Sequence, residues 1–260
     1  MTFSAEQKKR LTAAVEHLNR VQPGKSKLFV APQVSSDTFY ELGLLFFNQR
    51  DFVQSEKYLI AALKESADHI PAINLLLQLY QSAAMNHLGD GEHNEARQAL
   101  KKAENLIEKL PAGVNLNTLT LLGYVHKSLG QVYRRTDRML SDQSWEKAGK
   151  IFETVLMSNK NSASALNGMG NVLYHRGHFS QALEKHRQAL AAAPNYTAAA
   201  HDAALVCEKL MRVSSDQKEV WKTRAVEFWK TAVELSRNDP QFPPDYAGKI
   251  SARIQQLSAP

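Results

Sequence analysis

The chain has 260 residues, of which 43% are hydrophobic and 22% are charged, and its formal net charge is +6. Such a composition is ordinary for a globular protein and excludes disorder along the whole chain. The longest clear apolar run, residues 42–47, is too short to cross a bilayer. The single cysteine, Cys207, excludes an internal disulfide. We therefore expect a cytoplasmic protein without membrane contact.

Residues 1–35 are predicted to form a capping helix and a linker. Ser4 and Gln7 have the spacing of a capping box. An apolar stripe then follows at helical spacing, formed by Leu11, Val15, Leu18 and Val21. The basic residues near the start are not followed by an apolar core, so the segment does not have the pattern of a secretory signal.

The linker contains Gly24, Lys25 and Ser26, an order that also ends phosphate-binding loops. Such a loop needs a second glycine five residues earlier, after a strand, so that backbone amides converge on the phosphate. Asn19 holds that position, inside the predicted helix. The pattern therefore indicates a linker, and we expect no nucleotide or other cofactor.

Two segments of equal length, residues 36–69 and 163–196, align without a gap. Apolar residues three and four apart on both sides of a turn predict two helices in each. The alignment pairs residues of similar size: Gly43 with Gly170, Phe46 with Leu173, Phe52 with Phe179, Ser55 with Ala182, and Ala62 with Ala189. Small residues allow two helices to cross closely, and large ones fill the space between neighbouring pairs.

This pattern resembles the tetratricopeptide-repeat family. The residues that carry the resemblance are Leu42, Gly43, Phe46, Phe52, Ser55, Leu59 and Ala62 in one segment, and Met169, Gly170, Leu173, Gly177, Phe179, Ala182, Ala189 and Pro194 in the other. The resemblance implies an all-α, right-handed superhelical solenoid of antiparallel helix pairs. It also implies a protein-interaction module that is not an enzyme.

Three further segments repeat the order less strictly, which gives five predicted units at residues 36–69, 70–115, 116–162, 163–196 and 197–238. Each aligned repeat position that holds a small or a large residue is called a column. In the less regular units these columns hold Ala96, Ala103, Gly123, Trp145, Ala148, Phe152, Ala204, Ala225, Trp229 and Ala232. These units carry additional residues between their two helices. The added length is expected to form longer helices or protruding loops along one edge.

Residues 239–260 are predicted to end the stack with a capping helix. The stretch 243–257 places Ile250, Ile254 and Leu257 at helical spacing. A terminal repeat needs a covering helix with one polar face, which gives this segment a structural role.

Metal and catalytic motifs are weak. His175, His178 and His186 lie close in sequence, but the repeat register assigns His186 to the packing column of Leu59, Phe152 and Trp229. The histidines and acidic residues of 87–93 lack the spacing of a calcium loop. No catalytic motif stands out, and Cys207 is expected to be a buried thiol. We therefore predict no metal.

The candidate site is a peptide groove, which in this architecture is lined by the first helix of each unit. The register assigns to it Tyr40, Phe47, Asn74, Gln78, Gln81, Tyr124, Lys127, Asn167, Asn171, Tyr174 and His201. Amide side chains can pair with a peptide backbone, and aromatic rings can hold its side chains. A chaperone-type carboxylate clamp is disfavoured, because Asn167 stands where a lysine is needed and Asp202 would repel a carboxylate.

The sequence thus predicts a non-enzymatic scaffold or adaptor that captures a peptide or partner helix. One alternative is a binder of nucleic acid or an acidic partner, which would use a basic arm (Lys8, Lys9, Arg10, Lys25 and Lys27) and residues 133–138, from Tyr133 to Arg138. The aromatic residues are not interleaved with these charges, as a stacking surface requires. The other alternative is a regulatory or assembly subunit that docks through the lengthened turns.

Overall fold

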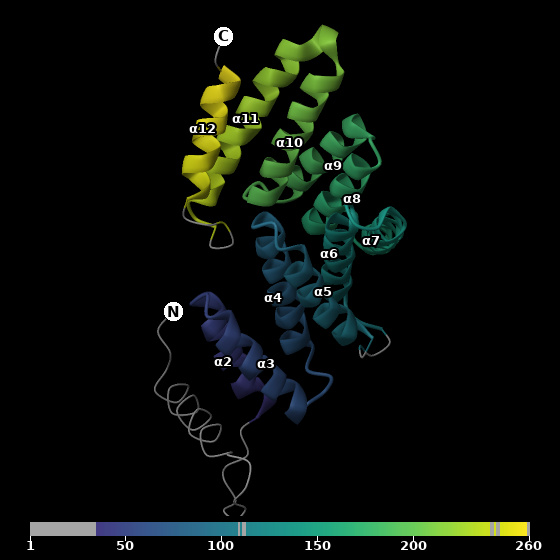
Figure 1. Ribbon diagram of the computed structural model, residues 1–260, viewed down its shortest axis with the longest axis vertical. Coiled ribbons are helices and arrows are strands. Elements are labelled where there is room, and N and C mark those ends of the chain that lie inside the picture. The colour runs from purple at the N-terminus through teal and green to yellow at the C-terminus, as the bar shows by residue number, and fades with distance from the viewer. Residues whose placement is uncertain (1–34, 109, 111–112, 240–241, 243–244, 259–260) are drawn as a thin grey trace, which may run out of the picture. The chain divides into compact units, whose positions relative to one another are not determined.

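The computed structural model describes residues 35–108, 110, 113–239, 242 and 245–258, and the predicted N-terminal capping helix and its Gly-Lys-Ser linker lie outside them. Within this part every regular element is a helix. Consecutive helices pack as pairs, as the sequence predicts (Figure 1). The pairs are α2 (Ser36–Asn48) with α3 (Phe52–Glu65), α4 (Ile70–Gly89) with α5 (His93–Ile107), α6 (Leu116–Tyr133) with α7 (Arg138–Ser158), α8 (Ala163–His175) with α9 (Phe179–Ala192), and α10 (Thr197–Val213) with α11 (Lys218–Ser236). A short 3-10 turn, Ser215–Gln217, precedes α11, and α12 (Tyr246–Ser258) follows it.

The chain divides into two compact units, Met1–Val114 and Asn115–Pro260. The first unit contains α2 to α5, and the second contains α6 to α12. Each unit is described by itself below.

Helix starts are set by local polar side chains. Ser35, Asp51, Asn115, Asp137 and Ser162 each accept a hydrogen bond from the backbone amide three residues further on. These bonds satisfy amides that have no partner within the helix. The sequence therefore fixes where these five first turns begin without help from distant residues.

The predicted small-residue column is confirmed at the helix crossings. A Cβ added at Gly43 would lie 2.6 Å from Leu59, and one added at Gly123 would lie 2.6 Å from Phe152. At Gly170 it would lie 2.5 Å from the ring of His186. Because real Cβ atoms do not approach this closely, each glycine is what allows its helix pair to cross.

The added residues of the less regular repeats lengthen helices. Helix α4 has 20 residues, α6 has 18, α7 has 21, α10 has 17 and α11 has 19. The regular repeats have helices of 13 and 14 residues. The sequence left longer helices and protruding loops equally open, and the structure resolves the choice in favour of helices joined by short turns.

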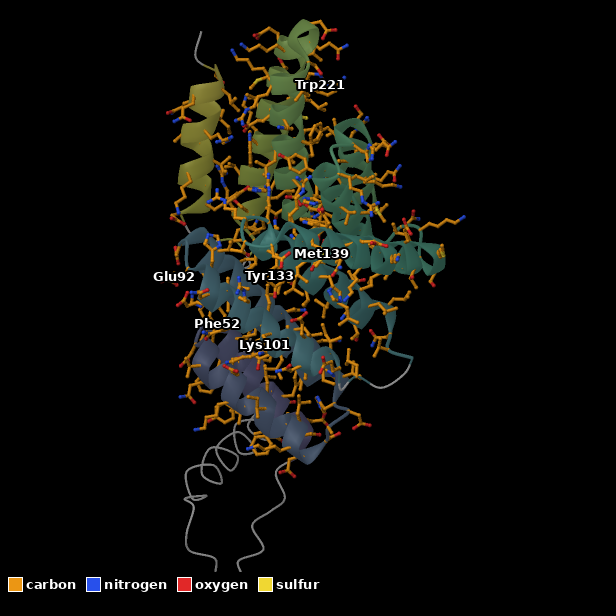
Figure 2. The ribbon with its side chains drawn as sticks, turned by 45° about the vertical axis from the view of Figure 1, so that its right-hand side comes forward. Phe52, Glu92, Lys101, Tyr133, Met139 and Trp221 are labelled. Atoms are coloured by element: carbon orange, nitrogen blue, oxygen red, sulfur yellow. The ribbon has the colours of Figure 1, made fainter. Side chains whose placement is uncertain are left out.

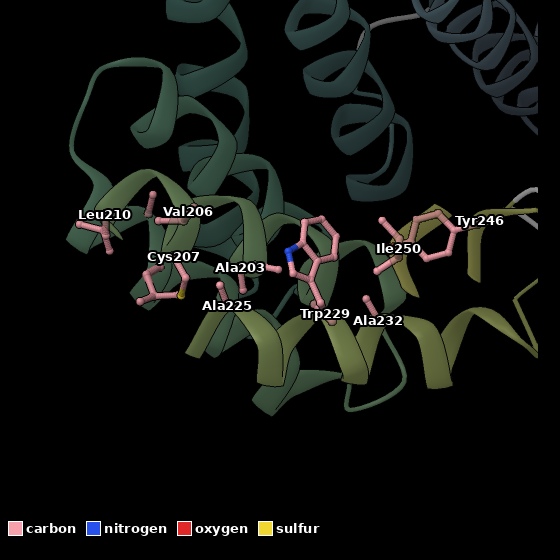
Figure 3. Packing of buried hydrophobic residues seen from close by; sticks show 13 residues of the cluster. Ala203, Val206, Cys207, Leu210, Ala225, Trp229, Ala232, Tyr246 and Ile250 are labelled. Atoms are coloured by element: carbon pink, nitrogen blue, oxygen red, sulfur yellow. The ribbon is translucent and has the colours of Figure 1, made fainter. Parts of the chain in front are cut away.

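The C-terminal helix packs on the last repeat. Tyr246 and Ile250 of α12 belong to the same buried cluster as Trp229 of α11, and Ile254 and Leu257 pack against it (Figure 3). The cluster also holds Cys207, whose side chain is fully buried. Helix α12 thus covers apolar surface that the fifth repeat would otherwise expose.

Candidate functional site

The predicted groove residues fall into two sets, one in each compact unit. Tyr40 and Phe47 lie on α2, and Asn74, Gln78 and Gln81 lie on α4 of the first unit. The second unit holds the remaining six, Tyr124 and Lys127 on α6, Asn167, Asn171 and Tyr174 on α8, and His201 on α10. In the second unit the structure brings Asn167 next to Asn171 and Tyr124 next to Lys127.

In the first unit the aromatic members contact neighbouring rings. The ring of Tyr40 lies 5.5 Å from that of His69, and the ring of Phe47 lies 5.8 Å from that of Phe52. His69 accepts the amide of Ala72 at Nδ1, so its Nε2 carries the proton and donates to Asp37 at 2.9 Å. All five predicted residues here are partly exposed.

In the second unit a polar cluster joins three helices. We call the residues Asn167, Asn171, His186 and Asp202 the Asp202 cluster. The Nδ2 atoms of Asn167 and Asn171 both donate to Oδ2 of Asp202 at 2.9 Å. His186 lies 2.7 Å from Oδ1 of Asn167 through its Nδ1. Residues from α8, α9 and α10 therefore orient one carboxylate.

Asn167 is inside the protein and is not available to a peptide, in contrast to our expectation from the sequence. Its side chain is 1% exposed and its amide is bonded at both ends. The cause lies in the helix crossing: Gly170 has no side chain, so the ring of His186 fits against α8 and reaches Asn167. Asn171 is partly exposed, but its NH₂ group also bonds the backbone oxygen of Asn167 at 3.1 Å.

Burial controls the charge states in this cluster. Because an amide oxygen can only accept, His186 donates from Nδ1 and leaves Nε2 buried without a partner. Burial lowers the pKa of His186, so the ring is neutral at pH 7. Burial raises the pKa of Asp202, but His186, His201, Lys127 and the Asn171 hydrogen bond together outweigh this and hold the pKa below its usual range.

Lys127 lies on α6 beside the cluster. Its ammonium group is 5.4 Å from the centroid of the Tyr124 ring, a cation–π distance. Burial lowers the pKa of Lys127, and the charge of Asp202 partly offsets this. The charges of Lys127 and Asp202 therefore attract each other, although no described basic residue lies within the ion-pair distance of 4.0 Å from Asp202.

Two tyrosines fix the edge of the same surface. The hydroxyl of Tyr124 donates to the backbone oxygen of Ser164 at 2.8 Å, so Tyr196, at 3.1 Å, must donate to Tyr124. Burial raises the pKa of both phenols, which stay neutral. One turn along α8 from Asn171, Tyr174 is partly exposed and meets Phe179 edge-on at 5.4 Å.

His201 contacts the chain's own C-terminal segment. Its Nδ1 lies 2.8 Å from the hydroxyl of Tyr246, and its ring lies edge-on to Trp229 at 5.0 Å. Nearby, the buried carboxylate of Glu208 accepts from Nε1 of Trp229 at 2.7 Å and pairs with Arg253 of α12. This end of the surface is therefore occupied by α12.

Sequence reasoning missed the part that Asp202 and Tyr246 play. The available signal for Asp202 was its position: it lies on the first helix of the fifth repeat, about one repeat length after Asn167 and Asn171. Repeat register alone therefore placed it next to two amides on the preceding first helix. No comparable sequence signal pairs Tyr246 with His201.

The other titratable groups that the sequence singled out do not gather. Within the described ranges no group of three or more His, Cys, Asp or Glu residues could hold a metal ion. His175 stacks on Trp145 at 4.5 Å, while His186 is buried elsewhere. Burial raises the pKa of Cys207 to about 12, which keeps it a thiol. None of the helices in this part of the chain is both long and apolar enough to span a membrane.

Comparisons with known proteins agree with this architecture. No protein-family model and no curated protein matches the chain. Among solved structures, TTC0263, described as a thermophilic TPR protein of Thermus thermophilus, matches with a TM-score of 0.60 and 16% identity over 86% of this chain and 98% of its own. The chain therefore has the tetratricopeptide-repeat fold.

Two other TPR structures are less similar. PilF of Pseudomonas aeruginosa has a TM-score of 0.45 and 15% identity, over 86% of this chain and 91% of its own. YrrB, described as a TPR protein with an unusual peptide-binding site, has a TM-score of 0.40 and 13% identity, over 95% of this chain and 97% of its own.

Proposed function

We propose that the chain is a non-enzymatic scaffold that captures an extended segment of a partner protein on the second unit. The binding surface is the first-helix face, formed by α6, α8 and α10 and presenting Tyr124, Lys127, Asn171, Tyr174, Asp202 and Leu205. These helices are neighbours in the structure. In this fold the first helices line the concave side, where an extended chain can lie.

The observation that carries the proposal is the mixture of groups on this face. Asp202 and Asn171 are partly exposed polar groups held in place by hydrogen bonds. Leu205 lies one turn from Asp202 and is 37% exposed, so it adds an apolar side chain to this face. Rigid polar groups beside apolar and aromatic side chains are what an extended peptide requires. The first unit offers a second surface of this kind, formed by Tyr40, Phe47, Asn74, Gln78 and Gln81.

Peptides selected from a random phage-displayed library against the full chain provide the test. We expect the variant with both Tyr174→Ala and Leu205→Ala to bind the selected synthetic peptides about tenfold more weakly by calorimetry, because it loses both apolar contacts. Circular dichroism of the variant should match the parent. Failure of the library to yield any peptide, or unchanged affinity in this variant, would contradict the proposal.

A second candidate function uses the ends of the long helices as a docking edge. Met139 on the first turn of α7 is 65% exposed, and Val213 and Val220, on either side of the turn between α10 and α11, are 55% and 50% exposed. Figure 2 labels Met139 and Trp221, the residue that follows Val220. The variant with both Met139→Ala and Val220→Ala is the matched control for the experiment above. Loss of binding in this variant alone would favour the docking edge.

A further inference from the structure

We propose that Asp202 recognises a cationic side chain, lysine or arginine, on the segment that the first-helix face binds. This inference rests on the proposed function and specifies its chemistry. Asp202 is partly exposed as a residue, at the surface that α8 and α10 share. Its orientation is set by the amides of Asn167 and Asn171, and Asn167 is itself set by His186.

The cluster is more than a stability device. A buried polar network is often no more stabilising than apolar side chains of the same volume, and it contributes most when every member is satisfied. Here both amides bond the same oxygen, Oδ2, and no described residue donates to Oδ1. The arrangement therefore holds a carboxylate still and leaves one of its oxygens for another donor.

Glu208, which follows Leu205 by three residues on α10, shows what a structural carboxylate looks like in this unit. It is 3% exposed, pairs with Arg253 across to α12, and has Arg212 at 3.7 Å. The charge of Glu208 is thus neutralised inside the protein. Asp202 has no such ion pair among the described residues, and the amides that hold it carry no charge.

A cation is the group that fits this arrangement. An ammonium or guanidinium group supplies both the missing N–H donor and the opposite charge, and such bonds are stronger than neutral ones. The phenol ring of Tyr124 and the side chain of Leu205 can contact the aliphatic stem of a lysine or arginine. A phosphate or carboxylate would instead meet a fixed negative charge, which argues against a nucleic-acid backbone at this position.

Lys127 makes the inference sharper. Its positive charge interacts with Asp202, although it rests on the ring of Tyr124. If a ligand cation binds Asp202, Lys127 repels it and weakens binding. If the ligand presents an anion, Lys127 attracts it and strengthens binding. The effect of removing this one charge therefore has opposite signs for the two classes of ligand.

The experiment uses the full chain and the peptides selected from the random phage library. We expect the selected sequences to share a lysine or arginine, and replacement of that residue by norleucine or citrulline to lower the affinity about tenfold. Asp202→Asn should lower the affinity for the parent peptide about tenfold and make that replacement nearly neutral. Lys127→Met should raise the affinity about threefold. Asp142→Asn, at an exposed carboxylate on α7, is the matched control and should change nothing.

Each outcome decides the question. Selected peptides without a shared basic residue, or with a shared acidic one, would overturn the cation site while leaving the scaffold function in place. Weaker binding in Lys127→Met would do the same. A library that yields no binding peptide would overturn the scaffold function itself. If Asp202→Asn fails to fold by circular dichroism, the peptide replacements and Lys127→Met still decide, because neither disturbs the cluster's hydrogen bonds.

Discussion

The amide of Asn167 is bonded at both ends inside the second unit, and this determines what its removal costs. Asn167→Ala leaves the buried Nδ1–H of His186 without an acceptor and removes one donor from Asp202. Each buried group left unpaired costs about 1–3 kcal/mol. We therefore expect a loss of at least about 1 kcal/mol in the free energy of unfolding, measured with urea. Asn195→Ala, at an exposed turn, is the control, and equal stability of the two variants would contradict the network.

Histidine burial predicts how stability depends on pH. Burial, with a smaller contribution from Lys147, lowers the pKa of His126 from 6.5 to about 4. Below pH 6.5 His126 binds a proton in the unfolded chain but stays neutral in the folded chain. Its contribution to the free energy of unfolding is therefore fully present above pH 6.5 and is lost as the pH falls toward 4. This pKa shift corresponds to about 3 kcal/mol in the free energy of unfolding. Burial lowers the pKa of His175, His186 and His201 as well, and these add to the loss.

The measurement is the free energy of unfolding at several pH values between 7 and 4 for the parent and for His126→Gln. We expect a shallower slope in the variant, because one of the groups that link folding to protons is gone. His178→Gln, at an exposed turn position, should keep the parent's slope. If the free energy of unfolding depended on pH equally in all three proteins, His126 would bind its proton as readily in the folded chain as in the unfolded chain.

At the scale of the helix pair, the close crossings explain why glycine occurs inside helices. A glycine there costs backbone entropy that only a packing reason can offset. At Gly170 an added Cβ would lie 2.5 Å from Cε1 of His186, whereas at Gly248 of α12 nothing lies within 4 Å. The two positions therefore form a matched pair of helical glycines that differ in their surroundings.

We expect Gly170→Ala to lower stability by about 1–3 kcal/mol, because His186 must move and its bond to Asn167 is disturbed. Gly248→Ala should raise stability by up to about 1 kcal/mol, because alanine is the better helix former in open surroundings. Thermal melts followed by circular dichroism would show the two shifts. Shifts of the same sign would mean that the crossing of α8 and α9 is looser than the distances indicate.

At the scale of the whole molecule, the division between Val114 and Asn115 predicts autonomous folding. The second unit has its own buried cluster around Trp229 and its own covering helix, α12. We expect residues 115–260, expressed alone, to be helical and to melt in one cooperative transition. A broad melt without a defined midpoint would instead mean that the repeats of the second unit depend on the remainder of the chain.

The sequence by itself determined the helical class, the pairing of helices, the register of the repeats and the small-residue column. These features depend on local periodicity and on helix caps such as Ser35 and Asp51, so they can be read without knowing which distant residues meet. The predicted C-terminal helix belongs to the same group, because its apolar stripe defines a face before any partner is known.

Only the tertiary structure decided which side chains face inward and what they bind. Asn167 has the helical position of a surface residue, but the missing side chain of Gly170 lets His186 reach it from the next helix. Asp202 looked like an obstacle to carboxylate binding, and the amides of the preceding repeat make it an oriented acceptor. His201 meets Tyr246, 45 residues away in sequence. Contacts of this kind depend on distances between helices, which periodicity along one helix does not encode.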